Sequence, residues 1–63
     1  MMTIQDLHDT CDNLNLYTKV FIVDSDRTPL LWNKMFLEVS YDLLQLKVEY
    51  FKIAGNEVII WVP

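Results

Sequence analysis

The residues of this chain whose types and spacing could perform chemistry stand in one short stretch, directly after a β-branched and aromatic run. Asp24, Asp26 and Thr28 form a D-x-D-x-T pattern behind Val-Phe-Ile-Val. In some phosphoryl-transfer enzymes, such a loop supplies a nucleophilic aspartate, an acid/base aspartate and a threonine, while a Mg²⁺ ion neutralises the phosphate charge. The pattern therefore has two interpretations, a phosphatase loop and the turn of a hairpin.

The rest of the chain favours the hairpin turn. A Mg²⁺ site of this kind needs further carboxylates and a cation from distant loops of a parallel sheet. Each crossover unit of such a sheet takes roughly 30 residues, whereas the whole chain has 63. Pro29 follows the pattern directly and would break the helix that the enzyme loop requires. We therefore predict a turn over 24–29, no catalytic or metal-binding residue, no cofactor and no enzymatic activity.

His8 and Cys11 are the only histidine and the only cysteine, and they stand close together in the sequence. On one helix their spacing would let them touch, as in a thiolate pair. The sequence places no third group to orient such a pair, and Cys11 falls on an apolar stripe, where a thiol behaves as a small hydrophobic group. Two such ligands are also too few for a zinc site. Both residues are expected to pack, and the single cysteine predicts a reducing compartment.

Charge and hydropathy argue against several classes of protein. Nine acidic residues oppose five basic ones, for a net charge of −4, and no basic stripe is visible, so direct binding of nucleic acid is disfavoured. The N-terminal residues lack the basic and apolar regions of a signal peptide, and no apolar run approaches the roughly 18 residues of a membrane span. We expect a cytoplasmic protein of one domain, residues 1–63, without membrane contact.

The spacing of apolar and turn residues predicts a layered fold. Thr3 and Asp6 have the spacing of a capping box, Ser40 is a good N-cap, and the only glycine, Gly55, marks a tight turn with positive φ. The expected elements are a helix over 4–12, strands over 17–23 and 30–35, a helical turn over 39–45, and strands over 46–53 and 58–62. They predict an α+β fold with the N-terminal helix packed on a small, mostly antiparallel four-stranded sheet.

Large apolar side chains are expected on both faces of this sheet. The last strand, Val58 to Val62, is apolar on both sides, and a single helix can cover only one face. Trp32 and Trp61 are of the residue type that most often anchors protein interfaces. Two interpretations stay open: the second face meets another protein, self or foreign, or Trp61 folds under the helical turn.

Four segments of the chain have a distinctive order of hydrophobic and turn residues: T-I-x-D-L from Thr3, K-V-F-I-V-D-S-D-x-x-P-L-L from Lys19, L-x-V-S-Y-D-L-L-x-L-x-V-E-Y-F from Leu37, and N-E-V-I-I-W-V from Asn56. In this the chain resembles a group of short proteins of Gram-positive bacteria and their phages and prophages. Ser40 stands where those proteins usually have proline. The resemblance implies an origin in a mobile element and no assigned catalysis, and it carries over no site residue.

These observations predict a non-enzymatic protein-interaction module of phage or mobile-element type. It would dock on a basic host protein, with inhibition of a nucleic-acid-handling protein such as a CRISPR nuclease as one role. The alternative is a self-associating structural or accessory phage protein, a homodimer through the apolar face of its sheet. The residues expected to contact the partner are acids and tryptophans: Asp6, Asp9, Asp12, Asp24, Asp26, Trp32, Glu57 and Trp61.

Overall fold

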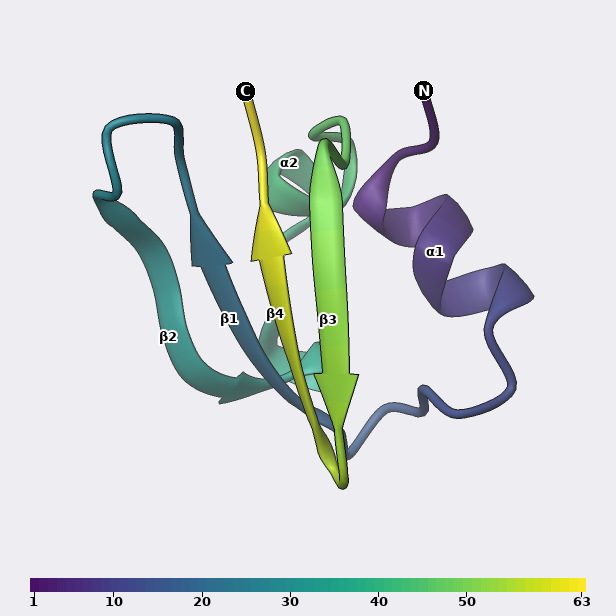
Figure 1. Ribbon diagram of the computed structural model, residues 1–63. Coiled ribbons are helices and arrows are strands. Elements are labelled where there is room, and N and C mark those ends of the chain that lie inside the picture. The colour runs from purple at the N-terminus through teal and green to yellow at the C-terminus, as the bar shows by residue number, and fades with distance from the viewer.

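The chain runs through a helix, a hairpin, two short helical turns and a second hairpin (Figure 1). The structure is a computed structural model and describes all residues from Met1 to Pro63. Its elements are α1 (Ile4–Thr10), β1 (Lys19–Val23), β2 (Pro29–Met35), the 3-10 helix η1 (Phe36–Glu38), α2 (Tyr41–Leu44), β3 (Tyr50–Ala54) and β4 (Glu57–Trp61). The predicted α+β fold, a helix on a small and mostly antiparallel four-stranded sheet, is confirmed.

The four strands lie in the order β2-β1-β4-β3, which places β1 and β4 at the centre. The pairs β1–β2 and β3–β4 are antiparallel hairpins, whereas β1 and β4 run parallel. A parallel pair needs a crossover connection, and the segment 36–49, with η1 and α2, supplies it. The sheet is therefore mixed, and its central parallel pair is a feature that the pattern of two hairpins did not predict.

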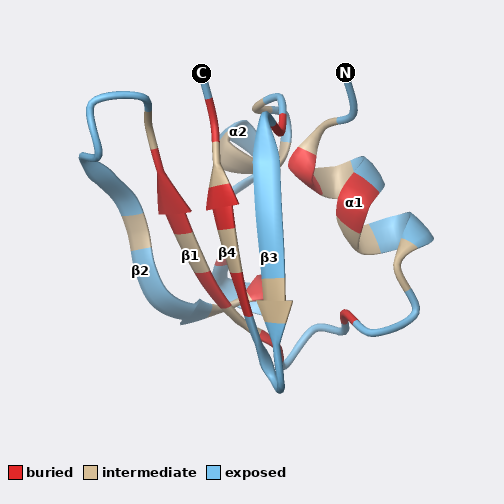
Figure 2. Ribbon diagram, in the orientation of Figure 1, coloured by how far each residue is buried: buried red, intermediate tan, exposed pale blue.

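The core lies between one face of this sheet and the helices (Figure 2). Val20 and Ile22 of β1 and Val58 and Ile60 of β4 expose no surface at all. Full burial of such a side chain contributes about 1.5–3 kcal/mol, so these two strands carry much of the hydrophobic stabilisation. The other members of the core cluster are Ile4, Leu7, Leu14, Phe36, Val39, Val48 and Val62.

The start of α1 forms as predicted. Thr3 Oγ1 accepts a hydrogen bond from the backbone N–H of Asp6, and Asp6 Oδ2 accepts one from the backbone N–H of Thr3, each at 3.1 Å. The helix ends at Thr10 and not at the predicted residue 12, because Cys11 turns to an extended backbone with φ −103° and ψ 113°.

The stretch predicted as a strand from residue 46 becomes β3 only at Tyr50. The Leu46 carbonyl accepts the N–H of Ile4 at 3.0 Å, and the N–H of Val48 donates to the Met2 carbonyl at 2.8 Å. This stretch is thus paired with the N-terminal segment, a contact between distant parts of the chain. It ties the first turn of α1 to the sheet.

Three residues adopt a left-handed backbone: Arg27 with φ 63°, Asn33 with φ 57° and Gly55 with φ 59°. Gly55 lies in the turn between β3 and β4, where the only glycine was predicted to serve this purpose. Asn33 lies where the register of β2 against β1 shifts, at a bulge that the sequence did not predict. Asparagine often ends a helix in a left-handed backbone, so Asn13 and Asn15 were candidates for the end of α1, but neither residue has a positive φ.

The helical turn predicted between the hairpins forms as α2 behind Ser40, whose hydroxyl accepts the N–H of Leu43 at 3.4 Å. The 3-10 helix η1 ahead of it was not predicted. It directs Phe36 into the core, and the Glu38 carboxylate accepts the backbone N–H of Met35 at 2.9 Å.

The capping box makes part of the stability depend on pH. The hydrogen bond from the backbone N–H of Thr3, assisted by the Thr3 side chain, holds the pKa of the Asp6 carboxyl below its usual 3.8. A carboxyl whose pKa falls on folding stabilises the folded state above its unfolded pKa, and this contribution disappears as the pH drops through the folded value. Urea titrations between about pH 6 and about pH 2 should therefore show a shallower acid loss of unfolding free energy in Asp6→Asn than in wild type.

Asp9→Asn is the matched control for this experiment. It removes a carboxylate of the same helix whose hydrogen bonds join it to the side chains of Gln5 and His8, not to a helix-end N–H. Because this variant leaves the capping box intact, it should keep the acid loss that Asp6→Asn removes. Parallel acid limbs for wild type and Asp6→Asn would contradict the prediction.

Candidate functional site

The face of the sheet opposite α1 is covered by no other element (Figures 1 and 2). In the strand register Val23 lies beside Trp61, and Trp61 beside Tyr50, so alternate residues of β1, β4 and β3 share this face. We call this surface the open face. Its residues are Lys19, Phe21, Val23, Tyr50, Lys52, Ala54, Glu57, Ile59 and Trp61, joined by Trp32 of β2, which contacts Phe21.

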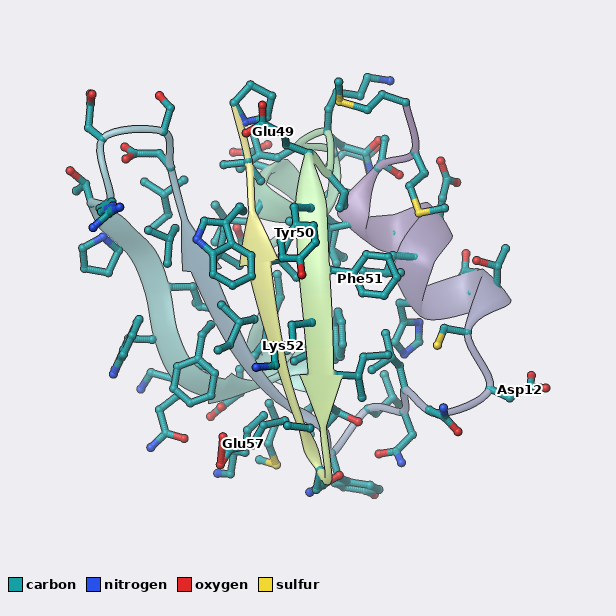
Figure 3. The ribbon with its side chains drawn as sticks, viewed as in Figure 1. Asp12, Glu49, Tyr50, Phe51, Lys52 and Glu57 are labelled. Atoms are coloured by element: carbon teal, nitrogen blue, oxygen red, sulfur yellow. The ribbon has the colours of Figure 1, made fainter.

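Two aromatic pairs dominate the open face. The rings of Phe21 and Trp32 meet edge to face, with centroids 4.8 Å apart and an interplanar angle of 80°. Tyr50 and Trp61 lie 5.2 Å apart at 46°, and Figure 3 shows Tyr50 on the near side of β3. Trp32 and Tyr50 expose 58% and 60% of their surface. Because paired rings hold one another in place, the open face presents a preformed apolar surface.

The open face is hollowed beside its two tryptophans. The hollow has a volume of about 690 Å³ and is lined by Val23, Arg27, Pro29, Trp32 and Trp61. Its walls are two indoles, a proline ring and a valine, and Arg27 is the one charged residue of the lining. Ligand sites commonly combine apolar walls with a few placed polar groups. This hollow could therefore take an apolar group that has an anionic neighbour.

The D-x-D-x-T stretch is the turn of a hairpin, as predicted, and the turn also places Arg27 in the lining of the hollow. Asp24 Oδ1 accepts the backbone N–H of Asp26 and that of Thr28, both at 2.9 Å. The Asp24 carbonyl also accepts the N–H of Arg27 at 3.0 Å. The carboxylate that a phosphatase would use as nucleophile thus holds the turn together. No cluster of three His, Cys, Asp or Glu side chains is positioned to hold a metal ion.

Some of the residues predicted to contact a partner are brought together. Trp32 and Trp61 line the same hollow, and the turn with Asp24 and Asp26 adjoins it. Trp61 contacts Tyr50 on the open face, so the interpretation in which it folds under the helical turn is wrong. Its indole remains part of the outer surface.

The acids of the first helix lie elsewhere. Asp6 and Asp9 belong to α1, and Asp12 follows it (Figure 3). The helix packs its Ile4 and Leu7 into the core, on the side of the sheet away from the open face. Asp6 is engaged in the capping box, and Asp9 accepts hydrogen bonds from neighbours on its own helix. The helix acids and the tryptophans therefore belong to different surfaces.

Residues that sequence reasoning had not assigned to a site give the open face its charge. Lys19 and Lys52 lie on it and Arg27 lines the hollow, which accounts for three of the five basic residues in the chain. Glu57 lies on the same face, opposite Lys19 in the register. Alternate residues of a strand share one side, so the predicted strand over 17–23 could have placed Lys19 beside Phe21 and Val23. The position of Arg27 depends on the tertiary approach of its turn to Trp61.

His8 and Cys11 take the packing roles that their pattern predicted. His8 Nδ1 lies 3.2 Å from Asp9 Oδ1, and its ring packs on Phe36 with centroids 4.7 Å apart. Cys11 is a half-buried free thiol that packs against the core. The helical spacing of four residues would also allow His8 to pair with Asp12, but the structure pairs it with Asp9.

Comparisons with protein-family models, with curated proteins and with solved structures found no match. The likeness to short phage and prophage proteins therefore stays a prediction from the sequence. None of the helices combines the length and the apolar character needed to cross a membrane. What the protein does is inferred from the chemistry of the open face.

The turn offers a direct test of the role of Asp24. Asp24→Ala removes an oxygen that accepts two backbone N–H groups and should lower the free energy of unfolding by about 1–2 kcal/mol in urea titration. Asp24→Asn keeps an accepting oxygen and should cost less than about 0.5 kcal/mol. Asp26→Ala, which removes a carboxylate of the same turn, is the control and should change little. Equal losses in all three variants would contradict the assignment.

Proposed function

We propose that this chain is a non-enzymatic protein-interaction module that docks through the open face. The observation that carries the proposal is the uncovered sheet face with two ordered aromatic pairs beside a hollow. Burial of fixed aromatic rings costs little side-chain entropy, and for this reason Trp and Tyr supply most of the affinity at many interfaces.

The local charge supports a particular kind of contact on this face. The chain as a whole is acidic, with a net charge of −4, but Lys19 and Lys52 lie on the open face and Arg27 lines its hollow. Complementary charges speed association and fix orientation. The part of the partner that meets the open face should therefore be apolar with carboxylates at its rim.

The biological setting that we propose is a phage or prophage protein acting in the cytoplasm of a bacterial host. Inhibition of a nucleic-acid-handling protein, such as a CRISPR nuclease, fits the net charge and the resemblance in sequence. Contact with a basic surface of such a host protein would involve Asp12, which follows α1, and the acids of α1. Partner identity and inhibition are both proposals.

Docking through the open face is tested by affinity capture with matched variants. Wild type, Trp32→Ala and Tyr41→Ala are immobilised and exposed to lysate of a Gram-positive host. Tyr41 is the control because it is an aromatic residue that is 74% exposed on α2, away from the open face. We expect a host protein that binds wild type and Tyr41→Ala and is depleted at least about tenfold on Trp32→Ala, as for an interface anchor.

Retention of the captured protein should also fall as NaCl rises from about 0.1 M to about 0.5 M, because salt screens the charged rim. Equal capture by Trp32→Ala, or no specific capture, would contradict the proposal. Inhibition is checked by adding the chain to the captured protein and measuring nuclease or nucleic-acid-binding activity. Hydrolysis of a generic phosphate ester that disappears in Asp24→Asn would overturn the non-enzymatic assignment.

The alternative of a self-associating accessory protein has one observation in its favour. The same uncovered aromatic face could pack on a second copy, and a chain of 63 residues gains stability from such burial. Light scattering of wild type and Trp32→Ala at low micromolar concentration separates the two roles. A dimer that Trp32→Ala dissociates would favour the homodimer over docking on a host protein.

A further inference from the structure

Arg27 is a cation without an ion pair in the wall of an apolar hollow. The one ion pair of the chain with nitrogen and oxygen within 4.0 Å joins His8 and Asp9. Asp24 and Asp26 are close to Arg27 in sequence, but neither carboxylate pairs with its guanidinium. Arg27 lines the hollow together with two indoles, and a guanidinium offers several donors to a planar anion such as a carboxylate.

The backbone of Arg27 adds a second observation. Its φ of 63° is left-handed, a conformation that glycine or asparagine adopts far more readily than a long side chain. Residues other than glycine are uncommon in this conformation, and strained ones cluster at functional sites. The turn that imposes this conformation is fixed by the two hydrogen bonds to Asp24 Oδ1. Arginine thus stands where the backbone alone favours glycine, and it lines the hollow.

We propose that the hollow binds the C-terminal residue of a partner protein, with an apolar side chain against Trp32 and Trp61 and the terminal carboxylate on Arg27. The inference rests on the proposed function and names the chemistry of the partner at that surface. All five lining residues surround one hollow, so the apolar group and the anion must be close together. A C-terminal apolar residue carries both on the same Cα.

The charges around the site are compatible with an anion. Glu57 is the acid on the strands of the open face, and it lies opposite Lys19 at the far end of β4 from Trp61. One oxygen of Asp24 is engaged by two N–H groups, and Asp26 is exposed to solvent at the turn. A two-bond contact between guanidinium and carboxylate is stronger and more directional than these longer-range repulsions in water.

The probe is N-acetylphenylalanine, which has an apolar side chain and a terminal carboxylate, compared with its uncharged amide. Binding is followed by ¹⁵N-resolved NMR of the full chain, with the two indole N–H signals as reporters of the hollow. We expect N-acetylphenylalanine to bind with a Kd on the order of 1 mM and about fivefold more tightly than the amide. N-acetyl-aspartyl-phenylalaninamide, which has its carboxylate inside the segment, should bind no better than the amide.

Variants assign the preference to residues. Arg27→Gln should keep the fold, as its NMR spectrum will show, and bind acid and amide equally. Trp32→Ala should lose both ligands. Lys47→Gln is the charge-matched control because Lys47 pairs with Thr3 at the N-terminal segment and does not line the hollow, and it should retain the fivefold preference.

Each other outcome overturns a stated part of the inference. Equal binding of acid and amide by wild type, or a preference that survives in Arg27→Gln, would remove the role of Arg27. Tighter binding of the internal aspartate would replace the C-terminal residue by an acidic loop. No shift of the indole signals with any probe would remove the site itself. If wild type shows no preference for acid over amide but its capture of a host protein still depends on Trp32, the proposed function stands and only this inference fails. If the preference is found but no host protein is captured, only the docking role fails.

Discussion

The structure depends on the parallel pairing of β1 and β4 at the centre of the sheet. Val20 and Ile22 pair in register with Val58 and Ile60, and these four side chains expose no surface. Every other element is placed by this pair: β2 and β3 are the hairpin partners of its members, and α1 packs over its buried side. A sheet built in this way has one dry face, and the short chain provides helices for that face only.

The open face exists because the short chain has helices on only one side of the sheet. The crossover that makes β1 and β4 parallel passes over one face of the sheet, and it contains both helical turns. The helix α1 packs on the same side (Figure 1). The opposite face keeps its aromatic side chains, which pair with one another in place of a covering layer. Exposed aromatic rings promote aggregation of a monomer without adding to its core, so a surface of this kind is typical of an interaction site.

Local hydrogen bonds determine where charge meets this aromatic surface. The Asp24 carboxylate accepts two backbone N–H groups and fixes the turn, in which Arg27 has a left-handed conformation and lines the hollow. The Asp6 carboxylate accepts the backbone N–H of Thr3 at the start of α1. Two of the acids that looked most available in the sequence are therefore structural, and the cation that looked incidental is the charged group of the hollow.

The sequence by itself determined the local features of this protein. Ser40 and the Thr3–Asp6 pair cap their helices, Gly55 turns with positive φ, and Val20 and Phe21 face opposite sides, because each outcome depends on neighbours within four residues. The α+β class followed from their order.

Only the tertiary structure decided which distant segments meet. The parallel pairing of β1 with β4, the pairing of Met2 with Val48, and the placement of Arg27 and Trp61 around one hollow involve residues that no local periodicity relates. Their contacts are selected by burial of one sheet face as a whole, a property of the assembled layers. The tryptophans could thus be named from the sequence, but the hollow between them could not.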